Sequence, residues 1–219
     1  MIRYRIQIVS DSTSWINAYI PALQEKWRTL GHQVSAIHDF KRMKTGDFAF
    51  YLGCGRIVPP TRLSLYRNNL VVHESALPLG KGWSPLSWQI LQGKNNVPIT
   101  LFEAAERVDS GLIYAQDVMR FQGTELIDDL RAIQAKKSVA LCLRFVREYP
   151  AIVKKAKSQK GRSSYFKRRT PADSRLNIDK SIRQQFNLLR IVDNERYPAH
   201  FRYRGHNYSL KIYGIHGGH

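Results

Sequence analysis

Residues 70–114 read LVVHESALPLGKGWSPLSWQILQGKNNVPITLFEAAERVDSGLIY, with one histidine and one aspartate near the ends of two apolar runs. The first run, Leu70 to Val72, is closed by His73 and followed by turn residues, a pattern typical of a buried strand that ends in a turn. The second run, Pro98 to Phe102, leads through a polar segment to Asp109, which we expect on a tight loop between strands. Ligands of open α/β sheets collect outside the carboxyl ends of the strands. We therefore expect His73 and Asp109 to lie at a functional site.

The rest of the first half alternates between strand and helix patterns. Expected strands cover 4–9, 34–37 and 48–52, and expected helices cover 15–30, 60–67 and 84–93. Pro21 lies inside the first helical pattern, so it either kinks that helix or sits in the first turn of a shorter helix beginning near Ile20. The alternation predicts an α/β fold with a doubly wound, mostly parallel, Rossmann-like sheet.

The second half is organised differently. Thr124 is expected to cap a long helix that has Glu125 in its first turn and ends at Pro150. The charge-rich stretch 154–169 is expected to be a solvated linker or a mobile loop. A helix near 179–190 and strands over 199–203 and 208–213, with a turn at 205–207, would form a small helix-plus-strands appendage. We expect a main domain over 1–160 and a basic linker with a small subdomain over 161–219, too small to be an independent domain.

Positive charge is the strongest compositional signal of the 219 residues. The formal net charge is +18, and Arg144 to Arg190 holds fourteen Lys and Arg against three acidic residues. Such a surface attracts polyanions: nucleic acid, a nucleotide diphosphate, a folate polyglutamate tail or an acidic membrane surface would all use these charges. Simple solubility would use them as well. Net charge indicates that anionic ligands are attracted to the surface but does not identify the ligand, so a direct nucleic-acid function is not favoured.

Other composition signals concern location and metals. No secretory signal precedes the first charged strand and no apolar run approaches the ~20 residues that span a bilayer, so we expect a cytoplasmic protein without membrane insertion. His216 and His219, on a glycine-rich tail, make a poor metal site, and no metal is expected. Gly80-Lys81-Gly82 lacks the full spacing of a Walker loop.

Several short motifs occur together. They are His73-Glu74-Ser75-Ala76-Leu77-Pro78, Asp109-Ser110-Gly111, Gly55-Arg56-Ile57-Val58-Pro59, Tyr165 to Asp173, and Leu188 to Ala199. In this combination the chain resembles the folate-dependent formyltransferase family, whose pattern is Asn-x-His-x-Ser-x-Leu-Pro followed some thirty residues later by an Asp-(Thr/Ser/Ala)-Gly loop. The resemblance is close over 45–120 and loose over 162–213, and is strongest to members that act on nucleotide-linked amino sugars.

The resemblance implies a methionyl-tRNA formyltransferase-like fold in which 1–160 is the catalytic domain. It implies an enzyme that moves a formyl group from 10-formyltetrahydrofolate to the amine of a UDP-, GDP- or dTDP-linked amino-dideoxy sugar, for surface polysaccharide such as lipopolysaccharide. It also implies that the cofactor lies against Arg56, Ile57 and Val58, with Val108 and Asp109 opposite. A homodimer formed through the C-terminal segment is compatible with this interpretation, although one chain does not reveal it.

Formyl transfer to an amine is an acyl transfer through a tetrahedral intermediate, so one group must take a proton and another must hold the oxyanion. We assign His73 to proton transfer and oxyanion contact, and Asp109 to electrostatic support of the ring. The structural alternatives are a strand-capping histidine and an Asx-turn aspartate. Glu74 would point to the opposite face of the strand, so it is not assigned a catalytic role. Ser75 would contact substrate or, more simply, stabilise the turn.

One departure from the family pattern concerns the asparagine two residues before the histidine, which is Val71 here. Asn68 and Asn69 lie upstream, and a two-residue shift along a strand moves a side chain by about 7 Å, so neither can substitute. Another donor for the formyl oxygen, a strand bulge, or a weakened or altered activity would account for the change. Two alternatives follow: an enzyme that formylates an aminoacyl-tRNA, and a folate- or nucleic-acid-binding module without catalysis.

Overall fold

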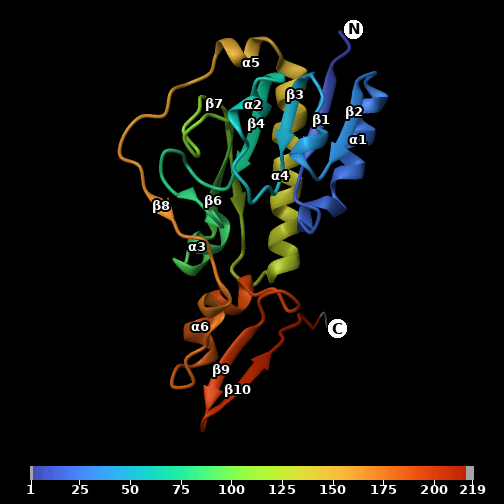
Figure 1. Ribbon diagram of the computed structural model, residues 1–219. Coiled ribbons are helices and arrows are strands. Elements are labelled where there is room, and N and C mark those ends of the chain that lie inside the picture. The colour runs from blue at the N-terminus through green and yellow to red at the C-terminus, as the bar shows by residue number, and fades with distance from the viewer. Residues whose placement is uncertain (1, 216–219) are drawn as a thin grey trace.

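The computed structural model of the protein describes residues 2–215, and a six-stranded sheet forms its centre (Figure 1). His216 and His219 lie outside the described residues. In spatial order the strands are β2 (Gln33–Ile37), β1 (Arg5–Val9), β3 (Gly46–Tyr51), β4 (Tyr66–His73), β6 (Asn96–Glu103) and β7 (Ile113–Arg120). β1 to β4 pair in parallel, whereas β6 and β7 are antiparallel to their neighbours. The predicted α/β class and mostly parallel sheet are confirmed, although the last two strands form a hairpin.

Both faces of the sheet are covered. One face carries α1 (Ile20–Thr29) and α4 (Ile127–Glu148) (Figure 1), together with the 3₁₀ helix η1 (Trp15–Ala18). These helices pack on inward side chains of the strands, such as Phe48, Phe50 and Leu70. The other face carries a smaller cluster that includes Phe40 of η2 (Phe40–Arg42). Pro21 lies in the first turn of α1, where its missing N–H costs nothing, so the shorter-helix alternative is confirmed.

Two expected helix boundaries are wrong. α2 covers only Pro60–Leu63, because Tyr66 already belongs to β4 and its side chain is buried against the sheet. α4 begins at Ile127, and Leu126 rather than Thr124 is its N-cap. Glu125 is not in the first turn: its carboxylate turns back to accept hydrogen bonds from the backbone N–H groups of Gln122 and Gly123.

The stretch 154–169 is mostly solvent-exposed, as expected of a solvated linker, but it also pairs with the main domain. After α5 (Ala151–Lys154), Lys157 exchanges backbone hydrogen bonds of 2.8 and 2.9 Å with Ile113 at the start of β7. β8 (Tyr165–Phe166) then pairs in parallel with β5 (Lys81–Gly82). Gly82 has φ 95°, and any Cβ there would collide with the Phe166 carbonyl, so the close approach requires glycine. Long-range backbone pairing therefore holds this charged segment against the main domain.

The chain ends in a small unit that projects below the sheet in Figure 1. It contains a 3₁₀ helix, η3 (Pro171–Ser174), then α6 (Ile182–Ile191) and the hairpin β9 (Ala199–Tyr203) and β10 (His206–Leu210). The hairpin turn falls at Arg204-Gly205, both with positive φ (45° and 85°), and not at 205–207 as expected. α3 (Pro85–Leu91) of the main domain contacts α6. Over residues 2–215, no helix combines the length and apolar character that a membrane crossing requires.

Candidate active site

A cavity of about 490 Å³ opens at the carboxyl ends of β1, β3 and β4. Its wall includes the loop after β1, the loop 53–58 after β3, and Glu74 after β4. These three strands are parallel, so their carboxyl ends meet at one edge of the sheet, and the strand order changes direction beside β1. The volume is in the usual range for small-molecule sites.

His73 is the last residue of β4 and lines this cavity, as expected. Its side chain is buried, with Nε2 2.8 Å from the carbonyl oxygen of Gly80 and 3.8 Å from Oδ2 of Asp109. A carbonyl oxygen only accepts, so the contact with Gly80 requires a proton on Nε2. The nearby carboxylate would attract the positive charge that the ring acquires on taking a second proton. The two residues that the sequence singled out therefore lie beside one another in one cavity.

The position of Asp109 beside His73 does not follow from the strand ends alone, because it depends on the fold of the loop after β6. β6 runs antiparallel to β4, and the loop after it closes where Glu103 N–H donates to the Leu112 carbonyl at 2.9 Å. The loop then folds back toward β4, with Asp109 in the left-handed region at φ 50°. Its carboxylate Oδ2 accepts a hydrogen bond of 2.8 Å from Gly82 N–H. The predicted position between two strands is correct, but the fold of the loop is what brings the carboxylate to the histidine.

Gln159 holds this loop from the segment expected to be mobile. Its amide Nε2 donates to the carbonyl oxygens of Asp109, at 2.9 Å, and Gly111, at 3.0 Å. Gln159 is thus a positioning residue for Asp109. Local sequence contained no signal for it, because the partners are about fifty positions away in a charge-rich stretch.

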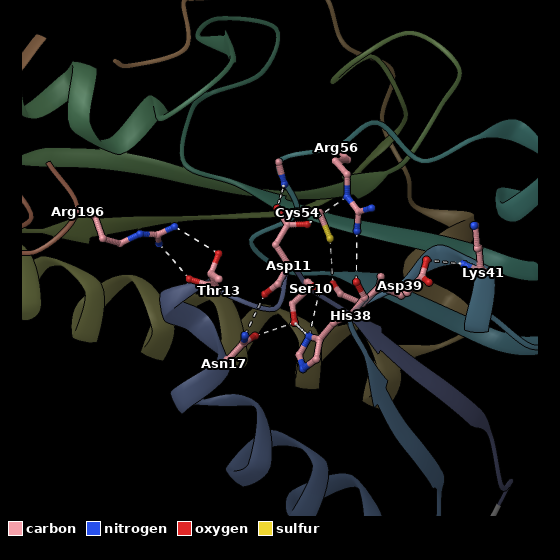
Figure 2. Close-up of polar contacts among 12 residues, drawn as sticks. Ser10, Asp11, Thr13, Asn17, His38, Asp39, Lys41, Cys54, Arg56 and Arg196 are labelled. Carbon is pink, nitrogen blue, oxygen red and sulfur yellow. Dashed lines mark hydrogen bonds and ion pairs between the residues drawn. The ribbon is translucent and has the colours of Figure 1, made fainter. Parts of the chain in front are cut away.

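The loop predicted to contact the cofactor is anchored by Asp11 (Figure 2). Asp11 accepts a hydrogen bond of 2.7 Å from Gly55 N–H and pairs with Arg56 at 3.5 Å. Arg56 also donates from Nη2 to the His38 carbonyl at 3.3 Å and lies over the Phe40 ring. Its guanidinium is thereby engaged in holding the loop, and Arg56 also lines the cavity.

Three apolar residues predicted to line the cofactor pocket, Ile57, Val58 and Val108, do line the cavity. Ile57 is 62% exposed, so its side chain is open to contact by a flat ring. Cys54 also lines the cavity, but burial raises the pKa of its thiol to about 12 and Sγ donates to the Val9 carbonyl. A thiol in this state is a poor nucleophile.

The wall beside His73 is apolar where the family pattern has asparagine. Val71 lines the cavity, and β4 has no bulge there, since Val71 pairs in register with Tyr51 and Phe102. The Asn69 side chain accepts a hydrogen bond from Tyr51 and donates to the Leu63 carbonyl, each at 2.9 Å. Asn68 donates to the buried carboxylate of Glu103 at 3.1 Å. Both amides are committed elsewhere, so neither takes the place of the missing one, and the bulge explanation fails.

The cavity continues around the end of β4 to the other face of the sheet. There Glu74, Arg131 and Gln134 line it, with Arg168, Arg196 and Tyr197 from the C-terminal unit. Arg131 pairs with Asp193 at 2.7 Å, and Arg196 donates to the Thr13 carbonyl at 3.0 Å (Figure 2). Glu74 does point to the face opposite His73, as expected, yet both residues border the same cavity.

Two further expectations concern Ser75 and metals. The Ser75 hydroxyl is buried and has no hydrogen-bond partner within residues 2–215, so it neither lines the cavity nor ties the turn. In the same part of the chain, no cluster of three or more His, Cys, Asp or Glu side chains is suited to hold a metal ion.

Comparison with known proteins places these features in a family. A family model described as formyl transferase matches residues 7–145. Among solved structures, the methionyl-tRNA formyltransferase from Clostridium thermocellum has a TM-score of 0.79 at 17% identity, over 98% of this chain and 94% of that one. A 4-N formyltransferase from Francisella tularensis has a TM-score of 0.70 at 17% identity, over 97% and 99%. HypX from Aquifex aeolicus, in complex with tetrahydrofolic acid, has a TM-score of 0.74 at 16% identity, over 95% of this chain and 37% of that one.

Proposed function

This chain belongs to the formyl transferase family and is a formyltransferase, and we propose that it carries the formyl group of 10-formyltetrahydrofolate to the amine of a nucleotide-linked amino-dideoxy sugar. The observation that carries the proposal is the continuous cavity around the end of β4, with His73 on one face and an arginine-rich wall on the other. A transfer between two substrates needs two approaches to one reacting carbon, and this cavity provides them.

The donor belongs on the His73 face. In this proposal the pterin ring lies against the loop 55–58 and Val108, and the formyl carbon lies near His73 and Asp109. His73 moves a proton and contacts the oxyanion, while Asp109 balances the charge on the ring. A tetrahydrofolate complex of the similarly folded HypX supports a folate-type donor.

The acceptor belongs on the opposite face. Arg131, Arg168 and Arg196 at this wall suit the diphosphate of a UDP-, GDP- or dTDP-linked sugar, because guanidinium groups bind phosphate oxygens through paired N–H donors. The similarly folded 4-N formyltransferase, spanned over 99% of its length, supports transfer of the formyl group to a nitrogen atom. In a cell we place the reaction in the cytoplasm, in the synthesis of surface polysaccharide such as lipopolysaccharide, with a homodimer as the working form.

A second candidate acceptor is an aminoacyl-tRNA. It is favoured by the net charge of +18 and by the likeness to a methionyl-tRNA formyltransferase that the chain spans over 94% of its length. Chain length therefore does not separate the two acceptors. The cavity volume of about 490 Å³, in the range of small-molecule sites, favours the smaller acceptor.

The test is to incubate purified protein with 10-formyltetrahydrofolate and a panel of nucleotide-linked 3-amino and 4-amino sugars. Mass spectrometry should find one sugar that gains a formyl group in place of a hydrogen, and the His73→Ala variant should not produce it. Filter binding of initiator tRNA over a salt series separates the second candidate, which requires tight, strongly salt-dependent binding. Formylated tRNA together with no formylated sugar would replace the proposal by that candidate.

A further inference from the structure

Glu74 is a carboxylate set into the wall of the cavity directly after His73. Gln134 of α4 donates from Nε2 to Oε1 of Glu74 at 2.6 Å. Gln89 of α3 donates to the Glu74 backbone carbonyl, so two helices fix the residue. A side chain held in this way is oriented before any ligand arrives.

Within residues 2–215, Gln134 is the one side chain that donates a hydrogen bond to the Glu74 carboxylate, and the carboxylate forms no ion pair with Lys or Arg. Arg131, one turn before Gln134 on α4, is instead paired with Asp193 at 2.7 Å. Burial raises the pKa of the Glu74 carboxyl, and the neighbouring His73, the bond from Gln134 and a backbone hydrogen bond only partly oppose this effect. A half-buried carboxylate without a cation is costly, and an arriving ammonium group would supply what it lacks.

We propose that Glu74 is the base for the acceptor: its carboxylate, which lines the cavity and has no Lys or Arg partner, binds the ammonium group of the incoming amine and removes one proton from it. This inference rests on the proposed function, since it requires an amine acceptor. It concerns a residue to which the family pattern assigns no role.

The placement of Glu74 suits this task. Consecutive residues at a strand end are about 3.8 Å apart at Cα and direct their side chains to opposite faces. His73 therefore faces the donor side and Glu74 faces the acceptor side, at the one edge where the two halves of the cavity join. A formyl carbon at that edge would lie between the two groups.

The proton count of the reaction closes with both groups in place. The ammonium gives its first proton to Glu74, and the free amine then attacks the formyl carbon to form the new C–N bond. A second proton moves from the attacking nitrogen to N10 of the folate, the bond between N10 and the formyl carbon breaks, and the third hydrogen stays on the amide product. Glu74 releases its proton to solvent when the product leaves.

This assignment also accounts for Val71. If Glu74 takes the proton of the acceptor, His73 is not needed as its base, and a doubly protonated ring can donate from Nδ1 to the oxyanion while Nε2–H stays on the Gly80 carbonyl. The oxyanion donor that is missing at Val71 is then supplied by the imidazole, in line with the interpretation that another donor polarises the formyl oxygen.

The test compares two small acceptors that differ in protonation at neutral pH. Ethylamine arrives as an ammonium ion, whereas methoxyamine arrives as a free amine. Glu74→Gln keeps the shape and the acceptor for Gln134, and it should lower ethylamine formylation by about 10²-fold or more while methoxyamine formylation stays within about tenfold of the wild-type rate. Glu25→Gln, on the exposed surface of α1, is the matched control and should change neither rate.

The pH profile gives a second readout. The charged and titratable groups near Glu74 are His73, Asp109 of the β6–β7 loop and Arg131 of α4, and α3 contributes the neutral Gln89. With wild type, kcat/KM for ethylamine should be flat between the pKa of Glu74 and that of the amine. With Glu74→Gln it should rise about tenfold per pH unit over the same range, because only free amine reacts. Glu74→Asp should restore the flat profile at a reduced rate.

Three outcomes would overturn the inference. They are unchanged ethylamine kinetics in Glu74→Gln, equal losses with both acceptors despite an unchanged melting temperature, and wild-type protein that formylates no amine at all. Failure of the proposed function looks different. If wild type formylates ethylamine but no nucleotide-linked sugar, the proposed acceptor class is wrong while the Glu74 comparison still stands.

Discussion

Asp109 allows its charge to be tested separately from its shape. Its backbone is in the left-handed region at φ 50°, which asparagine tolerates about as well as aspartate. An amide oxygen can also accept the hydrogen bond from Gly82 N–H. We therefore expect Asp109→Asn to lower kcat by about 10²-fold or more, because the ring of His73 loses its negative partner, with little change in melting temperature. Steady-state kinetics and thermal unfolding check both halves.

Asp109→Ala is the contrasting variant. It removes the bond to Gly82 and the left-handed preference as well, so it should lower both kcat and the melting temperature. A full-rate Asp109→Asn enzyme would show that the carboxylate is a turn residue only.

Val71 offers a second test at single-residue scale. If the imidazole already holds the oxyanion, then Val71→Asn adds a redundant amide, and we expect kcat to rise by less than about threefold. If the site lacks a donor, the same change should raise kcat by about 10² to 10³, the usual worth of one oxyanion donor. Val71→Leu, measured alongside, corrects for the change in bulk beside Tyr51.

At the scale of elements, local sequence patterns predicted the helix and strand ends that local interactions determine. The apolar run before His73 and the proline near the start of α1 were enough to place a strand end and a helix start. Thr124 is not the cap, and the neighbouring Glu125 accepts a hydrogen bond from Arg190, which is 65 positions distant and gives no local signal. The stretch 154–169 is exposed, as its charges indicate, but its pairing with β5 and β7 is a long-range backbone contact that the charges do not reveal.

In the candidate site, too, residues that belong to local motifs could be predicted, and residues that act through long-range contacts could not. His73, Asp109 and the loop 55–58 carry motifs, so their meeting in one cavity could be anticipated. Asp11 anchors the loop 55–58 at Gly55, and Gln159 anchors the loop that carries Asp109. The partners are 44 and 50 positions apart in the sequence, and a single sequence contains no sign of such pairs. The role of Glu74 was missed because the face of a strand is a poor guide where a cavity wraps around the strand end.

Arg190 joins α6 to the main domain, and its removal should be costly. It is 1% exposed and donates to the Glu125 carboxylate at 3.1 Å and to the Asn95 side chain at 3.0 Å. Arg190→Met keeps the bulk but leaves the carboxylate without its cation, so we expect a loss of about 3 to 5 kcal/mol in the free energy of unfolding. Urea denaturation at neutral pH measures it, and Arg183→Met, exposed on the same helix, should cost far less.

The loss in Arg190→Met should depend on pH. Burial alone would raise the pKa of Glu125, but backbone N–H bonds and Arg190 outweigh it and hold the pKa below its usual value. A lowered carboxyl pKa adds stability above the unfolded value of about 4.3, and this stability is lost as the pH falls through the folded value. The gap between wild type and variant should therefore be widest near neutral pH and shrink below about pH 4. A gap that is constant down to acid pH would mean that lost packing, not lost charge, explains the cost.

At the scale of the whole molecule, the net charge of +18 should act on the acceptor before it is bound. A positive surface raises the local concentration of an anionic substrate, and salt screens this field, since the Debye length falls from about 30 Å at 0.01 M to about 10 Å at 0.1 M. The cavity wall has exposed Arg168 and Arg196, whose interactions with phosphate are open to such screening.

For a nucleotide-linked sugar we therefore expect KM to rise about tenfold between about 0.01 M and about 0.3 M KCl, while kcat changes by less than about twofold, because the reacting groups are buried and poorly screened. Initial rates over a grid of salt and acceptor concentrations measure both constants. Methoxyamine, which is neutral, should show no rise in KM, and Arg196→Gln should reduce the rise for the sugar. If KM does not change with salt concentration, the basic surface serves solubility and not substrate attraction. A far steeper dependence, with tRNA as the better acceptor, would assign it to a polyanion, since the salt slope grows with the number of phosphates neutralised.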